Sequence, residues 1–261
     1  MSGIVTQAGF WGGRKGVLDP LSLDPALWLD AADEGTLFDA VSGGSTPGDG
    51  DTVARWEDKS GNDYHGVGSG TFPTRRIAVQ NGKDIIRWDA RGHFQTTLDY
   101  RIDNVDVFIV WEKTGNTANS FTDFGAILGG DALSGAGGRW NITTASTERR
   151  VAQVRSNGGA YSNRLATDLP LPSGAEIMWL RGSPAKVGGG RNTTSLEMAD
   201  HGLTPATTAG SFRIGEGNGS QYDFSIRGDM MEVLIFNAHL NTGDISAVYN
   251  YLVAKWGILL T

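Results

Sequence analysis

The segments GDMMEVLIF (228–236) and SAVYNYLVAKWGI (246–258) decide the fold, because they predict one strand followed by one helix. The first is a strand-length run of Met, Val, Leu, Ile and Phe that only Glu232 interrupts after Asp229. The second repeats apolar residues at helical spacing: Ile245, Val248, Tyr249 and Leu252, with Trp256 one turn further. Asn241 or Thr242 can cap the start of this helix, and Gly257 can end it.

Upstream of this block, the chain predicts strands separated by turns rich in Gly, Asn, Asp and Ser. The predicted strands cover residues 27–31, 85–88, 105–111, 125–128, 140–143, 151–155, 176–181, 211–214 and 230–236. No fixed-period repeat and no shift in composition divides the chain. Residues 18–261 therefore predict a single all-β sandwich domain with one C-terminal helix against a sheet.

Four tryptophans and one glutamate give expectations about the interior. Large aromatic rings dominate core burial, so we expect the core to contain Trp28, Trp56, Trp88 and Trp256. Glu232 lies between apolar residues on a predicted strand, and we expect its side chain to face outward.

Composition excludes several classes of function. The 261 residues include 22 Lys and Arg against 29 Asp and Glu, a net charge of −7, with no run of like charge. Nucleic-acid binding needs a cluster of Lys and Arg residues with net positive charge, which this chain lacks. No apolar stretch reaches the length that crosses a bilayer, so we expect no membrane insertion. The absence of cysteine excludes disulfides, thiolate metal sites and cysteine nucleophiles.

Residues 1–17 form a glycine-rich segment that we interpret as an N-terminal arm, for docking or as a linker. It contains an aromatic pair, Phe10 and Trp11, and a basic pair, Arg14 and Lys15. It has neither the basic nor the apolar region of a secretory signal, so we expect no export by that route.

Three motifs, in this order and spacing, carry a family resemblance: PALWLDAAD (25–33), WEDKSGNDYH (56–65) and the C-terminal block from Gly228 to Ile258. Over about residues 20–258 the chain resembles the concanavalin A-like, laminin-G-like jelly-roll domains of phage structural proteins and bacterial surface proteins. The resemblance implies a jelly-roll β-sandwich. The DKSGN motif (58–62) itself predicts a turn, because Asp and Ser side chains bond backbone N–H groups there.

The resemblance also implies that calcium binding is possible, because some members hold Ca²⁺ at the sheet rim. Hard oxygen ligands are available at Asp30, Asp33, Asp58 and Asn62. The same residue types are equally ordinary in surface turns. No other cofactor is expected.

Glycan binding needs an aromatic platform with planar polar groups nearby. One candidate surface joins Gln153 and Arg155, which alternate on a predicted strand, to Tyr161 and Asn163. Two others stay open, and the sequence does not choose between the three. They are Phe121 and Phe124 with Asn116 and Asn119, and Tyr222 with Asn218 and Gln221; Asn157 also lies near Tyr161.

Relatives of this sandwich include glycoside hydrolases, so an enzyme must be considered. A retaining hydrolase needs two carboxylates about 5.5 Å apart, and no Glu-x-Asp-x-x-Glu run supplies them here. The four histidines are scattered without metal-ligand spacing. Gly188–Gly190 lacks the Lys-Ser/Thr of a phosphate-binding loop and predicts a turn. We therefore expect no catalytic residues.

These observations favour a non-enzymatic phage virion structural protein, either a capsid decoration or head fibre or a tail appendage. The arm would contact other virion proteins, and the sandwich would meet a host surface polysaccharide. A secreted, extracellular polysaccharide-binding lectin is the first alternative. A glycan-degrading hydrolase is the second, and it lacks a visible carboxylate pair.

Overall fold

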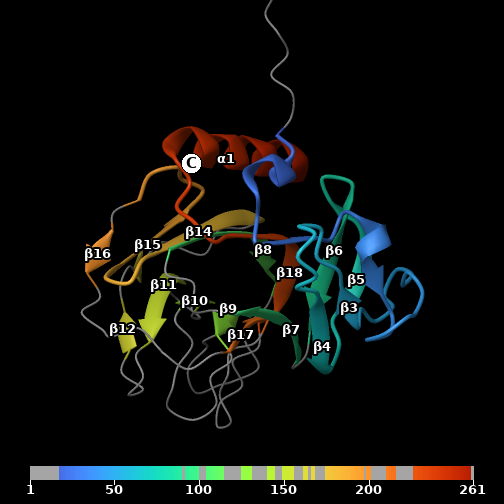
Figure 1. The fold of residues 1–261 in the computed structure, drawn as a ribbon. Helices are drawn as coiled ribbons and strands as arrows, with labels where there is room; N and C mark the ends of the chain where they lie inside the picture. The colour runs from blue at the N-terminus through green and yellow to red at the C-terminus, as the bar shows by residue number, and fades with distance from the viewer. Residues whose placement is uncertain are drawn as a thin grey trace, which may run out of the picture.

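Two antiparallel sheets face each other in the computed structural model (Figure 1). The structure describes residues 18–89, 92–99, 104–114, 125–130, 140–144, 149–155, 161–163, 166–167, 174–196, 198–200, 210–215 and 226–259. The eight-stranded sheet has the order β16-β15-β14-β8-β18-β6-β5, with β1 beside β18. Its strands are β1 (Leu27–Asp30), β5 (Thr74–Gln80), β6 (Lys83–Trp88), β8 (Val105–Lys113), β14 (Glu176–Gly182), β15 (Lys186–Arg191), β16 (Ala199–Asp200) and β18 (Gly228–Phe236).

The ten-stranded sheet has the order β12-β11-β10-β9-β17-β7-β4-β3-β2, with β13 beside β11. Its strands are β2 (Leu37–Phe38), β3 (Arg55–Trp56), β4 (Gly66–Gly70), β7 (Gly92–Asp99), β9 (Gly125–Gly130), β10 (Trp140–Thr144), β11 (Arg149–Arg155), β12 (Tyr161–Asn163), β13 (Ala166–Thr167) and β17 (Ser211–Ile214). Two 3₁₀ turns, η1 (Pro20–Leu23) and η2 (Glu34–Thr36), flank β1.

The central strands of the eight-stranded sheet are buried on both faces. In β8, Val107 and Ile109 pack into the core between the sheets, whereas Phe108 and Val110 pack into a second core beneath the helix α1 (Thr242–Trp256). Burial on both faces explains why this strand and β18 are continuous apolar runs in the sequence. Figure 1 shows α1 lying over this outer face.

Local capping fixes both ends of α1. The side chain of Asn241 accepts a hydrogen bond from the backbone N–H of Asp244 at 3.0 Å. Gly257 ends the helix with a positive φ of 68°, the left-handed conformation that glycine adopts without strain. The predicted helix and its caps are thus confirmed. Among the described residues, no helix has the length and apolar character needed to cross a membrane.

The predicted strands are all present, and the four tryptophans are buried as expected. Two expectations are wrong. Gly188–Gly190 is part of β15, where Gly189 lies opposite Leu180 of β14, and is not a turn. Glu232 is only 1% exposed, because the outer face of its sheet is covered by α1.

Candidate functional site

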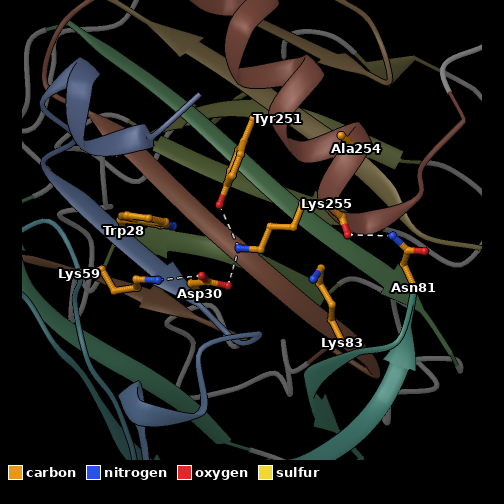
Figure 2. Close-up of a pocket in the computed structure, with 8 residues that line it drawn as sticks. All are labelled: Trp28, Asp30, Lys59, Asn81, Lys83, Tyr251, Ala254 and Lys255. Carbon is orange, nitrogen blue, oxygen red and sulfur yellow. Dashed lines mark hydrogen bonds and ion pairs between the residues drawn. The ribbon is translucent and has the colours of Figure 1, made fainter. Parts of the chain in front are cut away.

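An open hollow of about 460 Å³ lies where α1, β1 and the β5–β6 hairpin meet. Figure 2 shows its lining, which combines three lysines with aromatic, amide and carboxylate side chains. The lining residues are Trp28, Asp30, Lys59, Asn81, Lys83, Tyr251, Ala254 and Lys255.

The hairpin turn holds one wall of the hollow against the end of α1. Asn81 and Gly82 both have positive φ, at 50° and 70°, as a tight two-residue hairpin turn requires. The Asn81 side-chain amide donates to the carbonyl oxygen of Lys255 at 3.0 Å. Gln80 donates to the carbonyl of Trp256 at 2.7 Å. Both bonds satisfy carbonyls that the last helical turn leaves without an intrahelical donor.

Beneath the hollow, Glu232 accepts three hydrogen bonds and forms one ion pair. Its Oε1 accepts from Trp28 Nε1 at 2.7 Å and from the Tyr251 hydroxyl at 2.6 Å. Its Oε2 accepts from Trp256 Nε1 at 2.6 Å and lies 2.9 Å from Lys255 Nζ. Burial raises the pKa of Glu232, and the Lys255 charge and these hydrogen bonds oppose that rise. All four partners are donors, so this arrangement fits the carboxylate form.

Asp30 lies opposite Glu232 in the pairing of β1 with β18, and one ammonium group bridges their carboxylates. Lys255 Nζ lies 2.6 Å from Asp30 Oδ1, in addition to its contact with Glu232. Asp30 and Glu232 are far apart in the chain, so no local sequence pattern predicts that they lie together. The bridging ammonium and the burial of Glu232 make it a structural charge network.

Lys59 completes the network on the solvent side. Its Nζ lies 2.9 Å from Asp30 Oδ2 and 2.8 Å from Asp33 Oδ2. Burial opposes the charge of Lys59, but the bonds to both aspartates outweigh this effect and raise its pKa. The hydrogen bond from Lys59 is the main reason that the pKa of Asp33 is lowered.

The four candidate calcium ligands fall into two separate groups. Asp30 and Asp33 share Lys59, as described above. Asp58 accepts backbone hydrogen bonds inside its turn, and the Asn62 amide donates to the carbonyl of Ala26 at 3.2 Å. Within the described ranges, no three His, Asp or Glu side chains gather as a metal-binding group. Calcium binding remains a prediction.

The four predicted glycan-binding residues are brought together as two register pairs. Gln153 of β11 lies opposite Asn163 of β12, and Arg155 lies opposite Tyr161. Directly opposed positions in an antiparallel ladder share a face, as do positions two apart on one strand. The four positions therefore belong to one face of the ten-stranded sheet. The residues of the other two candidate surfaces, and Asn157, lie outside the described part of the chain.

The Gln153–Asn163 pair belongs to a row of aligned positions that crosses eight strands, which we name the polar row. From β3 to β12 it consists of Arg55, Val67, Gln95, Arg213, Gly129, Asn141, Gln153 and Asn163. The strand neighbours Trp56, Phe94 and Phe212 are in the core between the sheets. The polar row therefore occupies the face turned away from that core, and six of its eight positions are Arg, Asn or Gln.

The proposed arm residues Phe10, Trp11, Arg14 and Lys15 lie outside the described residues. The description begins at Leu18, which packs against the core beneath α1. Leu18 therefore lies on the α1 side of the domain, with both sheets between it and the polar row.

Comparison with known proteins shows which fold this chain has and nothing beyond the fold. No family model and no curated protein matches the chain. Among solved structures, the receptor binding domain of botulinum neurotoxin C/D mosaic serotype matches with a TM-score of 0.63 and 12% identity, over 90% of this chain and 54% of that one. The binding domain of Paraclostridial Mosquitocidal Protein 1 gives 0.59 and 10% identity, over 88% and 52%.

A third match is a Trypanosoma rangeli sialidase, with a TM-score of 0.53 and 10% identity over 89% of this chain and 33% of the enzyme. The chain thus spans about half the length of the toxin domains and a third of the sialidase. These likenesses, together with the two sheets and the terminal helix, identify the fold as an all-β jelly-roll sandwich with one C-terminal helix.

Proposed function

We propose that this chain is a non-enzymatic attachment module of a phage virion surface, and that it binds a host surface polysaccharide along the polar row. The length and the residue types of the polar row support this proposal. Neighbouring strands lie about 4.8 Å apart, so eight aligned positions extend over roughly 34 Å. Arg, Asn and Gln residues along such a line suit the successive hydroxyls of an oligosaccharide, with Arg55 already paired with Glu57 and the Gln95 amide with Ser211. The solved structures described as receptor-binding domains support a binding role for this fold.

The placement of the domain's first described residue supports a virion role. Leu18 packs on the α1 side, and the polar row lies on the outer face of the opposite sheet. An arm that docks on other virion proteins would therefore leave the polar row pointing away from the particle. This arrangement serves a capsid decoration or head fibre as well as a tail appendage.

The charge network supports binding without turnover. Asp30 and Glu232 are close enough to share Lys255, but Glu232 is 1% exposed, and its oxygens already accept three hydrogen bonds and pair with Lys255. A glycosidase needs one carboxyl group that can protonate the substrate and a second that can attack or activate water. Glu232 can reach neither a bound sugar nor water.

Removing the amides of the polar row should weaken polysaccharide binding. We expect the double variant Gln153→Ala/Asn163→Ala to bind purified host surface polysaccharide at least about tenfold more weakly by calorimetry, because two hydrogen bonds are lost. Lys186→Gln is the control, since Lys186 is on the other sheet with a side chain 53% exposed. Size-exclusion chromatography should show the polysaccharide unshortened. Wild-type affinity in the double variant, or shortening by the wild type, would contradict the proposal.

A virion component should be present in purified particles. Quantitative peptide mass spectrometry, normalised to the major capsid protein, should detect the chain after density-gradient purification of the phage. Copies comparable with capsid subunits would establish a decoration role, and a handful per particle would place the protein on the tail. Complete absence would refute the virion role and leave a free, secreted lectin as the alternative.

A further inference from the structure

The hollow at the end of α1 contains two lysines whose N–H groups are largely used. An ammonium group has three donors. Those of Lys255 bond Asp30 at 2.6 Å, Tyr251 Oη at 2.9 Å and Glu232 at 2.9 Å. Lys59 pairs with Asp30 and Asp33, and its Nζ also lies over the Trp28 ring, 4.2 Å from the ring centre. Both lysines are therefore already committed to groups of the protein.

The only carboxylate that lines the hollow has its acceptors engaged. Asp30 Oδ1 accepts from the Ala32 backbone N–H at 3.1 Å and from Lys255, and Oδ2 accepts from Lys59 at 2.9 Å. Both oxygens thus point their lone pairs at groups of the protein. Asp30 leaves little acceptor capacity for a further cation.

Lys83 is the third lysine of the lining, and it differs from the other two. It has no carboxylate partner among the described residues. Figure 2 shows its side chain rising from β6 into the hollow, facing the wall formed by Lys255. The preceding turn is attached to α1 through the Asn81 amide, which fixes the start of β6 beside the helix. Lys83 is therefore the lining lysine with charged donors available to a ligand.

We propose that this hollow binds an oxyanion, a carboxylate, sulfate or phosphate group, with Lys83 as its main partner. Charge-assisted hydrogen bonds from an ammonium group suit such a ligand. The carboxylates of Asp30, Asp33 and Glu232 balance the charges of the three lysines, so the hollow has no net positive charge to attract an anion. Binding therefore depends on local hydrogen-bond donors, and a dissociation constant on the order of 1 mM is expected. The site is distinct from the polar row and lies on the opposite side of the sandwich.

Calorimetric titration at constant ionic strength tests the site, with sodium sulfate, sodium phosphate and sodium glucuronate as probes and sodium chloride as the blank. We expect Lys83→Gln to weaken binding at least about tenfold. It removes the one lysine of the hollow's lining that has no carboxylate partner among the described residues. Lys83→Arg should retain binding, and Lys186→Gln should match the wild type. Thermal unfolding of each variant without ligand checks that it is folded.

The probes also separate the sources of the anion. Tighter binding of glucuronate than of the inorganic anions would assign the site to an acidic sugar, and equal binding would assign it to free oxyanions. Equal affinities in wild type and Lys83→Gln, or a response no larger than that to chloride, would overturn the proposal. Gln153→Ala should leave anion affinity unchanged, so a failure here and a failure of the polar row are distinguishable.

Discussion

We expect Glu232→Gln to lower the free energy of unfolding by about 3 kcal/mol, as removal of one partner from a buried ion pair does. The variant keeps the size of the side chain but removes the charge that Lys255 neutralises at 2.9 Å. It also turns an NH₂ group toward neighbours that are themselves donors, Trp256 Nε1 at 2.6 Å among them. Urea unfolding, followed by tryptophan fluorescence, measures the loss.

A more exposed carboxylate, Glu57 on the other side of the domain's two sheets, provides the control for this result. Glu57 lies 3.1 Å from Arg55, and its side chain is 34% exposed, against 1% for Glu232. Glu57→Gln should cost less than about 1 kcal/mol, because water screens such a pair. A loss for Glu232→Gln no larger than this would contradict the charge network.

A double variant separates charge from packing. Glu232→Leu/Lys255→Met removes both charges and substitutes apolar side chains. It should be more stable than Glu232→Leu alone, because no ammonium group is left beside the site of the removed carboxylate. The double variant should regain only part of the lost unfolding free energy, since the hydroxyl of Tyr251 still loses its acceptor. If the loss of unfolding free energy in the double variant equals the sum of the losses in Glu232→Leu and Lys255→Met, the two side chains are not coupled.

The elements that were predictable from sequence are those whose signal is local. Helix α1 has its apolar spacing and both caps within a few residues of one another. The strands β8 and β18 have continuous apolar runs. The turn at Asp58 combines side chains that bond their own neighbouring backbone. Each of these signals needs no knowledge of distant parts of the chain.

The errors arose where a distant element decides the environment. Glu232 does point away from the core between the sheets, but α1 covers that face and supplies three of its four donors, with Trp28 of β1 as the fourth. Gly188–Gly190 forms a strand because β14 pairs with it, and a Cβ on Gly190 would lie only 2.7 Å from Thr193 Cγ2. From local sequence alone, Glu232 is expected to be solvent-exposed and Gly188–Gly190 is expected to form a turn.

The candidate site shows the same division. The residue types of the glycan surface were predictable, but the polar row exists only through the pairing of eight strands. The Asp30–Glu232 pair depends on the register of β1 against β18 in the same way. Register between distant strands has no local signature in one sequence.

The second large effect is expected at Asp58, whose carboxylate holds the turn of residues 58–62 against the free edge of β1. Its Oδ1 accepts from the buried backbone N–H of Trp28 at 2.9 Å and from that of Ser60 at 2.9 Å, and its Oδ2 accepts from Tyr64 at 3.1 Å. The backbone N–H of Lys59 donates to the Trp28 carbonyl at 2.8 Å. The turn thus replaces a missing neighbouring strand at this edge.

Asp58→Ala should therefore lower the free energy of unfolding by about 3 kcal/mol, because three backbone donors lose their acceptor and that of Trp28 is buried. Asp58→Asn retains one side-chain oxygen and should lose less. Glu57→Ala, one residue earlier, should cost under about 1 kcal/mol, since Glu57 has only its exposed pair with Arg55. Urea unfolding of all three variants measures these differences.

Repeating the measurement with millimolar calcium and with EDTA separates the two roles that the sequence left open for Asp58. If the carboxylate acts through the turn, the loss in Asp58→Ala is the same in both solutions, because backbone N–H groups accept no metal. If it ligates calcium, the ion stabilises the wild type and not Asp58→Ala, since a ligand stabilises only the state that binds it. The three N–H groups already directed at Asp58 favour the first outcome, because a cation beside these donors would have to displace them.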